Sequence, residues 1–428
     1  MRLLTEMDLP LLPVEQPAFA ADPTAYVEVA RREHPWLAKG NVGGYVIHGY
    51  QAVKDILYMD DKLRPYFDGV AEFYGAERTP WGRFMSEMMI ARHGPDHARL
   101  RGSAQATFTP RNVNRYRGLM RHVISDLLDA WAPKGKFDFA DFASYFPITV
   151  FCGLLGVSAE IIPRIRDALE TQAASTTFNR DVLPAMLRGF EVLWDFADSA
   201  VLERERRGVG NDGLLDAMIA AKTAGKIDET EIRQNLIMFV TAGYDTSKNM
   251  LGLIMYLMLQ HRDHWERCAE DIGFCGKVVQ ETLRHSSIAS VYRAVAKDFE
   301  YGDVAFPEGT LLFFMMGLAG RDPSVFSEPM EFHPERTNVH QHMAFGRGAH
   351  FCIGMHLARA QLEEAVHLIA QRLRKPRVAG EVTWRPYLGI WGLRTLPIQF
   401  EPTAARELLP GQAAEEGSAA VCPFQPPA

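Results

Sequence analysis

The sequence predicts a mainly α-helical single domain with a smaller β portion, and three observations support this prediction. Between residues 96 and 283, apolar residues recur at three- and four-residue spacing, most clearly over 112–131 and 161–171, which is the periodicity of amphipathic helices. After Tyr292 the pattern changes to short β-like segments on either side of a turn at 307–309. No internal repeat and no linker divides the chain, so we expect one domain.

The elements follow from local patterns in chain order. Residues 45–47 are expected to form a short strand that leads into a helix over 50–57. Further helices are expected over 229–261, over 276–285 and from 355 onward, with strands over 299–314 and 384–400. We expect the domain to span residues 1–402. Residues 403–428 are rich in Ala, Glu, Pro and Gly without periodicity, which predicts a tail outside the core, flexible or docked on the surface.

Composition excludes several classes of protein. The chain has 428 residues, 47% of them hydrophobic and 23% charged, and a formal net charge of −7, which disfavours nucleic acid as a partner. The longest apolar runs are about half the roughly 20 residues of a membrane-spanning helix, and the N-terminus lacks an apolar signal core. We therefore expect no membrane span and a cytoplasmic location. Five cysteines without a C-x-x-C pair indicate neither a disulfide scaffold nor a zinc ribbon.

The expected helix over 229–261 would be about 50 Å long, enough to cross a domain. Its apolar periodicity is interrupted at Ala242-Gly243-Tyr244-Asp245-Thr246, where glycine weakens the helix and the Thr246 hydroxyl can bond back to the carbonyl of Ala242. We expect a groove at this point, with Asp245 and Thr246 as a proton-delivery pair. A polar patch that merely faces solvent is the alternative.

A second motif is Glu281-Thr282-Leu283-Arg284, in which a carboxylate and a guanidinium three residues apart share one helix face. Such pairs are common on exposed helices and contribute little. This helix, however, leads into the apolar segment 286–291 and then into strands. A pair at this junction could be buried, and its role would then be architectural.

The third motif surrounds Cys352, where Phe345 to Gly354 contain three glycines that permit sharp bends or close approach. A dinucleotide-binding loop is disfavoured because the third glycine is missing at its usual spacing. A zinc site with His350 and His356 is disfavoured because there is no second Cys/His pair at ligand spacing. A structural core thiol remains an alternative. The helix that begins after Gly354 would favour a thiolate through its amides and dipole, so Cys352 is a candidate axial ligand of a haem iron.

These three motifs occur in the order that is typical of one family. A-G-x-D-T at 242–246, E-x-x-R at 281–284 and F-G-x-G-x-H-x-C-x-G at 345–354 together resemble the cytochrome P-450 superfamily. The first two are weak alone, whereas the third is highly specific. The resemblance covers about residues 20–400, and the short N-terminus resembles the soluble bacterial type that depends on a ferredoxin.

The resemblance implies a single-domain cytochrome P-450 fold with haem b between the long central helix and the helix after the cysteine loop. Cys352 would be the proximal ligand of the haem iron, Phe345 would shield its sulfur, and Gly354 would permit close packing. Glu281 and Arg284 would form a buried network with Arg336. The residues expected to meet the two haem propionates are His97, Arg101, Arg293 and His350, and other expected cofactor contacts are Gly346, Ala242 and Gly243.

The resemblance also implies a reaction. The chain would be a monooxygenase that inserts one oxygen atom from O2 into a hydrophobic small molecule, with hydroxylation the expected outcome and Asp245 and Thr246 organising protons. Electrons would come from a separate ferredoxin and its NAD(P)H-dependent reductase, which would dock near Arg99, Arg347 and Arg359. A peroxygenase or rearranging haem-thiolate enzyme and a non-catalytic haem gas sensor are the alternatives.

The segments that line the distal pocket in this family are largely apolar here, although each residue could instead belong to the core. They are expected to suit a hydrophobic substrate, with flexible methionines that adapt to it. Terpenoids, aromatic hydrocarbons, fatty acids and steroids all remain open as substrates, and Arg83 could anchor a carboxylate or simply be solvated. The candidate pocket residues are Trp81, Phe84, Met85, Met88, Val240, Thr241, Ile288, Ala289, Val291, Ile390 and Trp391.

Overall fold

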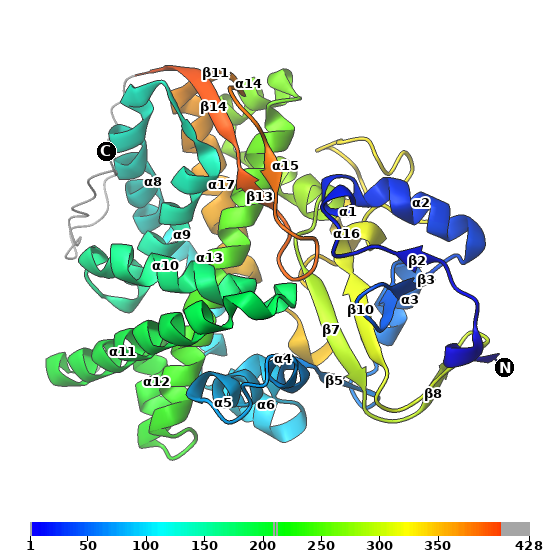
Figure 1. Cartoon of the computed structure of the whole chain (residues 1–428). Coiled ribbons are helices and arrows are strands. Elements are labelled where there is room, and N and C mark those ends of the chain that lie inside the picture. Colours follow the sequence, from blue (N-terminus) through cyan, green and yellow to red (C-terminus); the bar gives the residue numbers. More distant parts are fainter. Residues whose placement is uncertain (1, 209, 211–212, 404–428) are drawn as a thin grey trace.

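A computed structural model describes residues 2–208, 210 and 213–403. A large helical part and a smaller sheet-rich part lie side by side (Figure 1), which confirms the predicted fold class. The predicted tail, apart from its first residue Thr403, lies outside the described residues. No helix among the described residues is long and apolar enough to cross a membrane.

The α-helices range from long ones in the helical part to short ones that connect other elements or lie beside the sheet. The α-helices are α1 Pro17–Ala21, α2 Pro23–Glu33, α3 Tyr50–Ile56, α4 Phe67–Phe73, α5 Pro80–Glu87, α6 Gly94–Gly102, α7 Pro110–Arg115, α8 Arg117–Trp131, α9 Phe139–Leu155, α10 Ile162–Ala173, α11 Leu183–Arg207, α12 Leu214–Thr223, α13 Glu229–Met258, α14 Arg262–Glu270, α15 Ile272–His285, α16 Met316–Ala319 and α17 Met355–Arg372.

The strands form four small sheets. They are β1 Arg2–Leu3, β2 Leu11–Leu12, β3 Leu37–Gly40, β4 Tyr45–Ile47, β5 Leu63–Pro65, β6 Lys136–Asp138, β7 Ser290–Val295, β8 Phe299–Tyr301, β9 Val304–Phe306, β10 Leu311–Met315, β11 Leu373–Val378, β12 Thr383–Trp384, β13 Leu393–Thr395 and β14 Pro397–Pro402. The largest sheet has the order β2-β3-β4-β10-β7-β5. In this sheet β10 pairs in parallel with β4 and antiparallel with β7, and the second pairing sets Phe313 opposite Tyr292.

Most predicted elements are confirmed, with local differences. The segment 112–131 is divided into α7 and α8 at Tyr116, whose amide bonds to the Val113 carbonyl. The long helix ends at Met258 rather than 261, because the next turn tightens into bonds from Gln260 and His261 to carbonyls three residues earlier. The turn at 307–309 is confirmed, with Gly309 at φ +83°.

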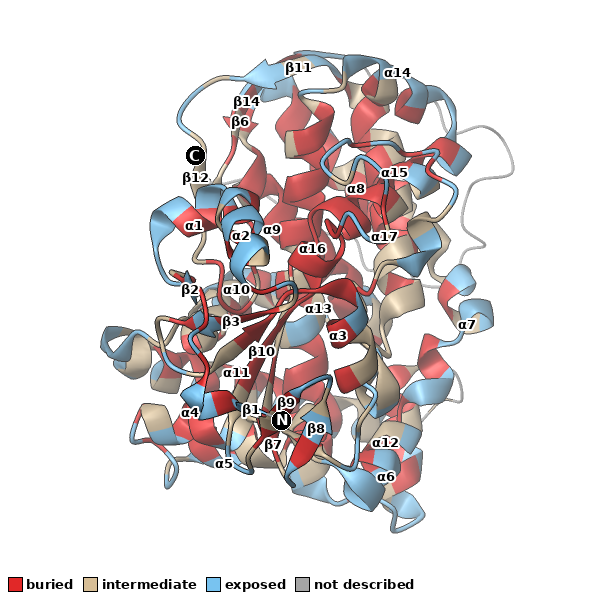
Figure 2. Ribbon diagram, turned by 90° about the vertical axis from the view of Figure 1, so that its right-hand side faces the viewer, coloured by how far each residue is buried: buried red, intermediate tan, exposed pale blue. Residues whose placement is uncertain are grey.

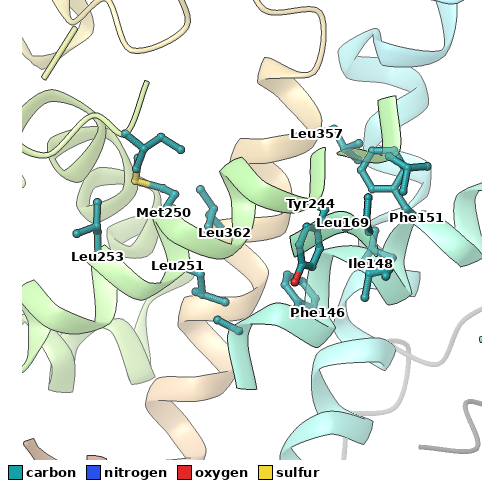
Figure 3. Packing of buried hydrophobic residues seen from close by; sticks show 14 of the residues in the cluster. Phe146, Ile148, Phe151, Leu169, Tyr244, Met250, Leu251, Leu253, Leu357 and Leu362 are labelled. Carbon is teal, nitrogen blue, oxygen red and sulfur yellow. The ribbon is translucent and has the colours of Figure 1, made fainter. Parts of the chain in front are cut away.

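Helix α13 lies at the centre of the helical part. Its first turn is closed by a capping box in which Asp228 accepts from the Glu231 amide and Glu231 accepts from the Asp228 amide. It then packs against α9, α10, α11, α15 and α17, and Figure 2 shows the helices around it as the most buried part of the molecule. In Figure 3, Tyr244 lies among side chains of α9 and α10, while Leu362 of α17 approaches the same helix near Met250.

Helix α13 continues through this segment without a break, from Glu229 to Met258, so Gly243 does not divide it. The glycine serves packing instead. A Cβ atom there would lie 2.1 Å from Cε2 of Phe151 on α9, so only glycine allows the two helices to approach this closely. The bond from Thr246 Oγ1 to the Ala242 carbonyl is confirmed at 2.7 Å.

Candidate functional site

A cavity lined in part by α13 and α17 leaves about 860 Å³ of space free of protein atoms, part of it open to solvent. Helix α13 contributes Thr246, Ser247 and Met250 on one side, and α17 contributes Ala358 and Leu362 on the other. The rest of the wall comes from Leu57, the end of α15, the segment that leads into β7, β7 itself and the cysteine loop: Leu283, Ser287, Ile288, Ala289, Val291, Arg293, Ala344, Phe345, Gly346, Arg347, His350 and Cys352. Thr246 and the cysteine loop therefore share one cavity.

The cysteine loop is held by its backbone. The amide of Cys352 donates to the Phe345 carbonyl at 2.9 Å, which closes the loop, and Gly346 and Gly348 adopt φ of +72° and +69°. Both conformations favour glycine. Gly348 also has no room for a side chain, because a Cβ there would lie 2.9 Å from Oδ1 of Asp60. Asp60 accepts a bond from the Ala349 amide at 2.9 Å.

The electrostatics of Cys352 differ from the sequence prediction. Burial raises the pKa of its thiol, although the amides of Gly354 and Met355 and the charge of Arg101 act in the opposite direction. The helix amides alone therefore do not produce a thiolate in this protein. A bound cation would, because a thiol that coordinates a metal loses its proton.

Basic groups crowd one end of the cavity. The rings of His97 and His350 lie 4.2 Å apart between centroids, and Arg293 lies in the same wall as His350. Burial, together with the neighbouring arginines, lowers the pKa of His97 and lowers that of His350 to about 3. Burial also lowers the pKa of Arg293 to about 10. Arg101 donates to the Phe351 carbonyl at 2.8 Å, beside Cys352.

This cluster fits an anionic ligand. His97 Nε2 is buried and has no hydrogen-bond partner among the described residues. An unpartnered buried nitrogen is costly, and the pKa values of both histidines are lowered first by burial and then by the positive charge of nearby arginines. Carboxylates placed at this end of the cavity would supply the missing partners.

Glu281, Arg284 and Arg336 meet in the interior. Both Glu281 and Arg284 are fully buried, with Oε1 of Glu281 2.7 Å from Nη2 of Arg284 and 3.3 Å from Nε of Arg336. Arg284 also donates to the carbonyls of Gly320, Pro329 and Glu331. The carboxylate accepts a further bond from the His333 amide at 2.9 Å. This network fixes the segment that leads to the cysteine loop.

Asp245 and Thr246 face different surroundings. Thr246 lines the cavity, whereas Asp245 does not. The Asp245 side chain is 6% exposed, and its Oδ1 lies 2.5 Å from Nη1 of Arg385. Asn249 Nδ2 donates to the same oxygen at 2.9 Å. The carboxylate predicted to deliver protons is therefore ion-paired inside the protein.

The candidate substrate residues divide into two groups. Ile288, Ala289 and Val291 line the cavity, and Ile390 forms a β-bridge with Ala289. Thr241 is partly exposed and does not line the cavity. The remaining candidates are buried in the apolar core and do not line the cavity either: Trp81, Phe84, Met85, Met88, Val240 and Trp391.

Two of these aromatic residues have partners of their own. Trp81 Nε1 donates to Gln172 Oε1 at 2.9 Å, and Trp391 Nε1 donates to the Ala20 carbonyl at 2.9 Å. Trp391 is therefore buried and bonded to α1, and its contact with a substrate stays a prediction.

Several other sequence assignments change in detail. Ala242 and Gly243 do not line the cavity, and Gly243 contacts Phe151 instead. Arg99 forms a two-point ion pair with Glu231, at 2.9 and 2.7 Å, and Arg83 is exposed. Sequence reasoning missed Arg385, because its partner Asp245 lies 140 residues earlier in the chain and no motif spacing connects them.

Comparison with known proteins assigns the chain to a family. The cytochrome P450 family model matches residues 190–376. The luteothin monooxygenase of Streptomyces thioluteus is 34% identical over 398 residues, which are 92% of this chain and 96% of that protein. The chain belongs to the cytochrome P450 family. As a member, it is a monooxygenase that uses haem and O2 and receives electrons from a redox partner.

Other P450s agree with this assignment. The polyketide biosynthesis cytochrome P450 PksS of Bacillus subtilis (strain 168) is 30% identical over 324 residues, covering 74% of this chain and 78% of that protein. The solved structure of epothilone B-bound cytochrome P450epoK superposes with a TM-score of 0.84 at 22% identity, covering 92% of this chain and 100% of that one. The second similarity supports the fold alone.

The residues present fit a haem. Among the residues that line the cavity, Cys352 is the one that carries a thiol. A Cβ on Gly354 would lie 3.9 Å from this sulfur, so the glycine leaves space beside it. The buried basic cluster with its unpartnered His97 nitrogen matches the two propionates. In this P450, Cys352 would hold the iron, and His97, Arg101, Arg293 and His350 would bind the carboxylates.

Proposed function

We propose that this P450 hydroxylates an apolar polyketide-type small molecule, using haem b and electrons from a ferredoxin. The observation that carries this proposal is that Cys352, in the loop before α17, and Thr246 of α13 line one cavity. A sulfur ligand on one side and a hydroxyl on the other are the arrangement that oxygen activation requires. The substrate class rests on the printed name of the polyketide biosynthesis relative and on the apolar wall formed by Met250, Ile288, Ala289 and Val291.

The reaction balances as follows. One C–H bond of the substrate and O2, together with two electrons and two protons, give one C–OH group and one water molecule. A thiolate-ligated haem supplies the electron density that favours O–O cleavage. Thr246 lines the cavity, and its Oγ1 donates to the Ala242 carbonyl at 2.7 Å. When the hydroxyl turns from this carbonyl to an acceptor in the cavity, it can pass a proton to that acceptor.

The electron donor is proposed to dock beside the cysteine loop. Tyr58 is 66% exposed and Phe351 is 38% exposed, and the guanidinium of Arg347 lies 5.8 Å from the centroid of the Tyr58 ring. Apolar side chains beside an arginine suit a small acidic ferredoxin. Arg359 remains a candidate contact, whereas Arg99 is already paired with Glu231.

Reconstitution tests this proposal. The haem-loaded protein is titrated with polyketides and with terpenoid, steroid and fatty-acid controls, and binding is followed as the blue shift of the Soret band. Compounds that bind are then incubated with NADPH, ferredoxin and ferredoxin reductase, or with hydrogen peroxide alone. We expect a hydroxylated polyketide only with the electron-transfer proteins. Product formed equally well with peroxide alone would identify a peroxygenase and contradict the proposal.

A further inference from the structure

Arg385 is the nearest charged partner of Asp245, the carboxylate beside the cavity-lining Thr246. Its Nη1 lies 2.5 Å from Asp245 Oδ1 and its Nη2 3.5 Å from Oδ2. The two side chains are 14% and 6% exposed, so water competes little for either one. A hydrogen-bonded charge pair of this kind fixes the direction of the carboxylate.

The backbone holds Arg385 in place. Its amide donates to the Gly392 carbonyl at 3.0 Å, which closes the loop between β12 and β13. The same loop is bonded to the cavity wall, because the Trp391 amide donates to the Ile288 carbonyl at 2.8 Å and the Ser290 amide donates to the Gly389 carbonyl at 3.1 Å. The loop that presents Arg385 is thus joined to the wall that contains Ile288.

Other charges near the pair keep Arg385 cationic. Burial opposes its charge, but Asp245 and, more weakly, Glu170 outweigh burial and raise the pKa of the guanidinium. Glu170 on α10 is itself bound by Tyr244 and Lys248 of α13. Asp245 therefore has its ionic partner in Arg385, while the neighbouring acid is bonded by the lysine and the tyrosine.

We propose that Arg385 is a positioning residue for proton supply: it holds the Asp245 carboxylate in the orientation from which protons reach Thr246. This inference rests on the proposed hydroxylation, because it concerns the fraction of electrons from NADPH that is used to form hydroxylated product. Without Arg385 the carboxylate would keep the Asn249 amide as a partner but would lose the charged group that fixes its direction. Electrons would then be released as hydrogen peroxide.

A double-mutant cycle in the haem-loaded enzyme tests this inference. Arg385→Gln, Asp245→Asn and the double variant are compared for hydrogen peroxide released per NADPH consumed. We expect each single variant to raise this ratio several-fold over wild type, and we expect the double variant to equal Asp245→Asn. Additive effects, or a wild-type ratio in Arg385→Gln, would overturn the proposal.

Three measurements separate positioning from general damage. In Arg385→Gln the substrate dissociation constant from the Soret shift is expected to stay within about twofold of wild type, and the ferrous carbonyl spectrum is expected to stay unchanged. The reason is that Arg385 does not line the cavity that would hold the substrate and the haem. The thermal midpoint of the haem-loaded protein should fall in both single variants and fall no further in the double variant. Independent falls in the midpoint would show that the pair does not form in solution and would overturn the proposal.

Two further variants complete the design. Arg385→Lys keeps a positive charge and should recover part of the coupling; no recovery relative to Arg385→Gln would contradict a role through charge. Arg204→Gln breaks a similar pair, in which Nε lies 2.6 Å from Oδ1 of Asp216 and that carboxylate is 6% exposed, away from the cavity. It should leave the peroxide ratio unchanged. If the wild-type enzyme forms no hydroxylated product with NADPH and the electron-transfer proteins, the proposed function fails. If wild type forms product but the variants behave as in the contradicting outcomes above, only the role of Arg385 fails.

Discussion

Replacement of Glu281 by glutamine should strongly destabilise the protein, because it removes the charge from a fully buried network. Glu281 accepts bonds from Nε and Nη2 of Arg284 at 2.8 and 2.7 Å, and from the His333 amide at 2.9 Å. Both Glu281 and Arg284 are 0% exposed. An amide cannot accept at both ends, so its NH2 group would face the donors of an arginine that stays charged. Breaking one side of a buried pair costs about 3–5 kcal/mol.

The size of the effect can be expressed as a shift in thermal midpoint. For 428 residues, about 2.1 cal/mol/K per residue gives an unfolding entropy of about 0.9 kcal/mol/K. The expected loss therefore lowers the midpoint by roughly 3–6 °C. Because the His333 amide and Arg336 are also released from the carboxylate, the segment before the cysteine loop loosens and less haem should be retained.

The assay is differential scanning calorimetry of the haem-loaded protein, together with haem content per chain. The matched control is Glu266→Gln, which breaks an exposed pair with Arg262 whose side chains are 53% and 64% exposed. Exposed helix pairs contribute about 0.3–0.5 kcal/mol, so the control should shift the midpoint by less than about 1 °C. Equal midpoints for the two variants would refute the reasoning.

Three further predictions concern α13 and its neighbours. Gly243→Ala should lower the thermal midpoint by about 1–3 °C, because its new Cβ would lie 2.1 Å from Phe151 and overpacking costs about 1–3 kcal/mol; an unchanged midpoint would contradict this packing. Thr246→Ala should raise hydrogen peroxide release per NADPH while Thr246→Ser keeps it near wild type, and equal ratios would remove the hydroxyl from proton supply. Burial raises the pKa of Glu170, but Lys248 and Tyr244 outweigh it and leave that pKa below 4.5. The Glu170 carboxylate therefore stabilises the protein above pH 4.5, and this stabilisation is lost as the pH falls through its lower pKa in the folded state. In Glu170→Gln, the free energy of unfolding should therefore decrease less steeply than in wild type as the pH is lowered.

The sequence predicted those features that depend on local spacing. The E-x-x-R spacing placed Glu281 and Arg284 on one helix face, and the structure pairs them. The glycines around Cys352 predicted sharp bends, and Gly346 and Gly348 have positive φ. The helix after Gly354 begins at Met355, where the change in periodicity indicated it.

Features that depend on tertiary packing escaped prediction. Gly243 suggested a weakened helix, but the approach of Phe151 from α9 decides its role. The helix position of Cys352 suggested a thiolate, whereas burial raises the pKa of the thiol, and burial is set by residues from several elements. Arg385 and Asp245 belong to segments 140 residues apart, so only the folded chain reveals their contact.

The most direct test of the account is the carbonyl spectrum of the ferrous protein with and without the Cys352 sulfur. Wild type and Cys275→Ala, which removes a different buried thiol, are predicted to show the band of thiolate-ligated haem. Cys352→Ala is predicted to lose that band while its far-ultraviolet circular dichroism stays helical. A thiolate-type band that persists in Cys352→Ala, or that is absent from haem-loaded wild type, would contradict the assignment of the sulfur ligand.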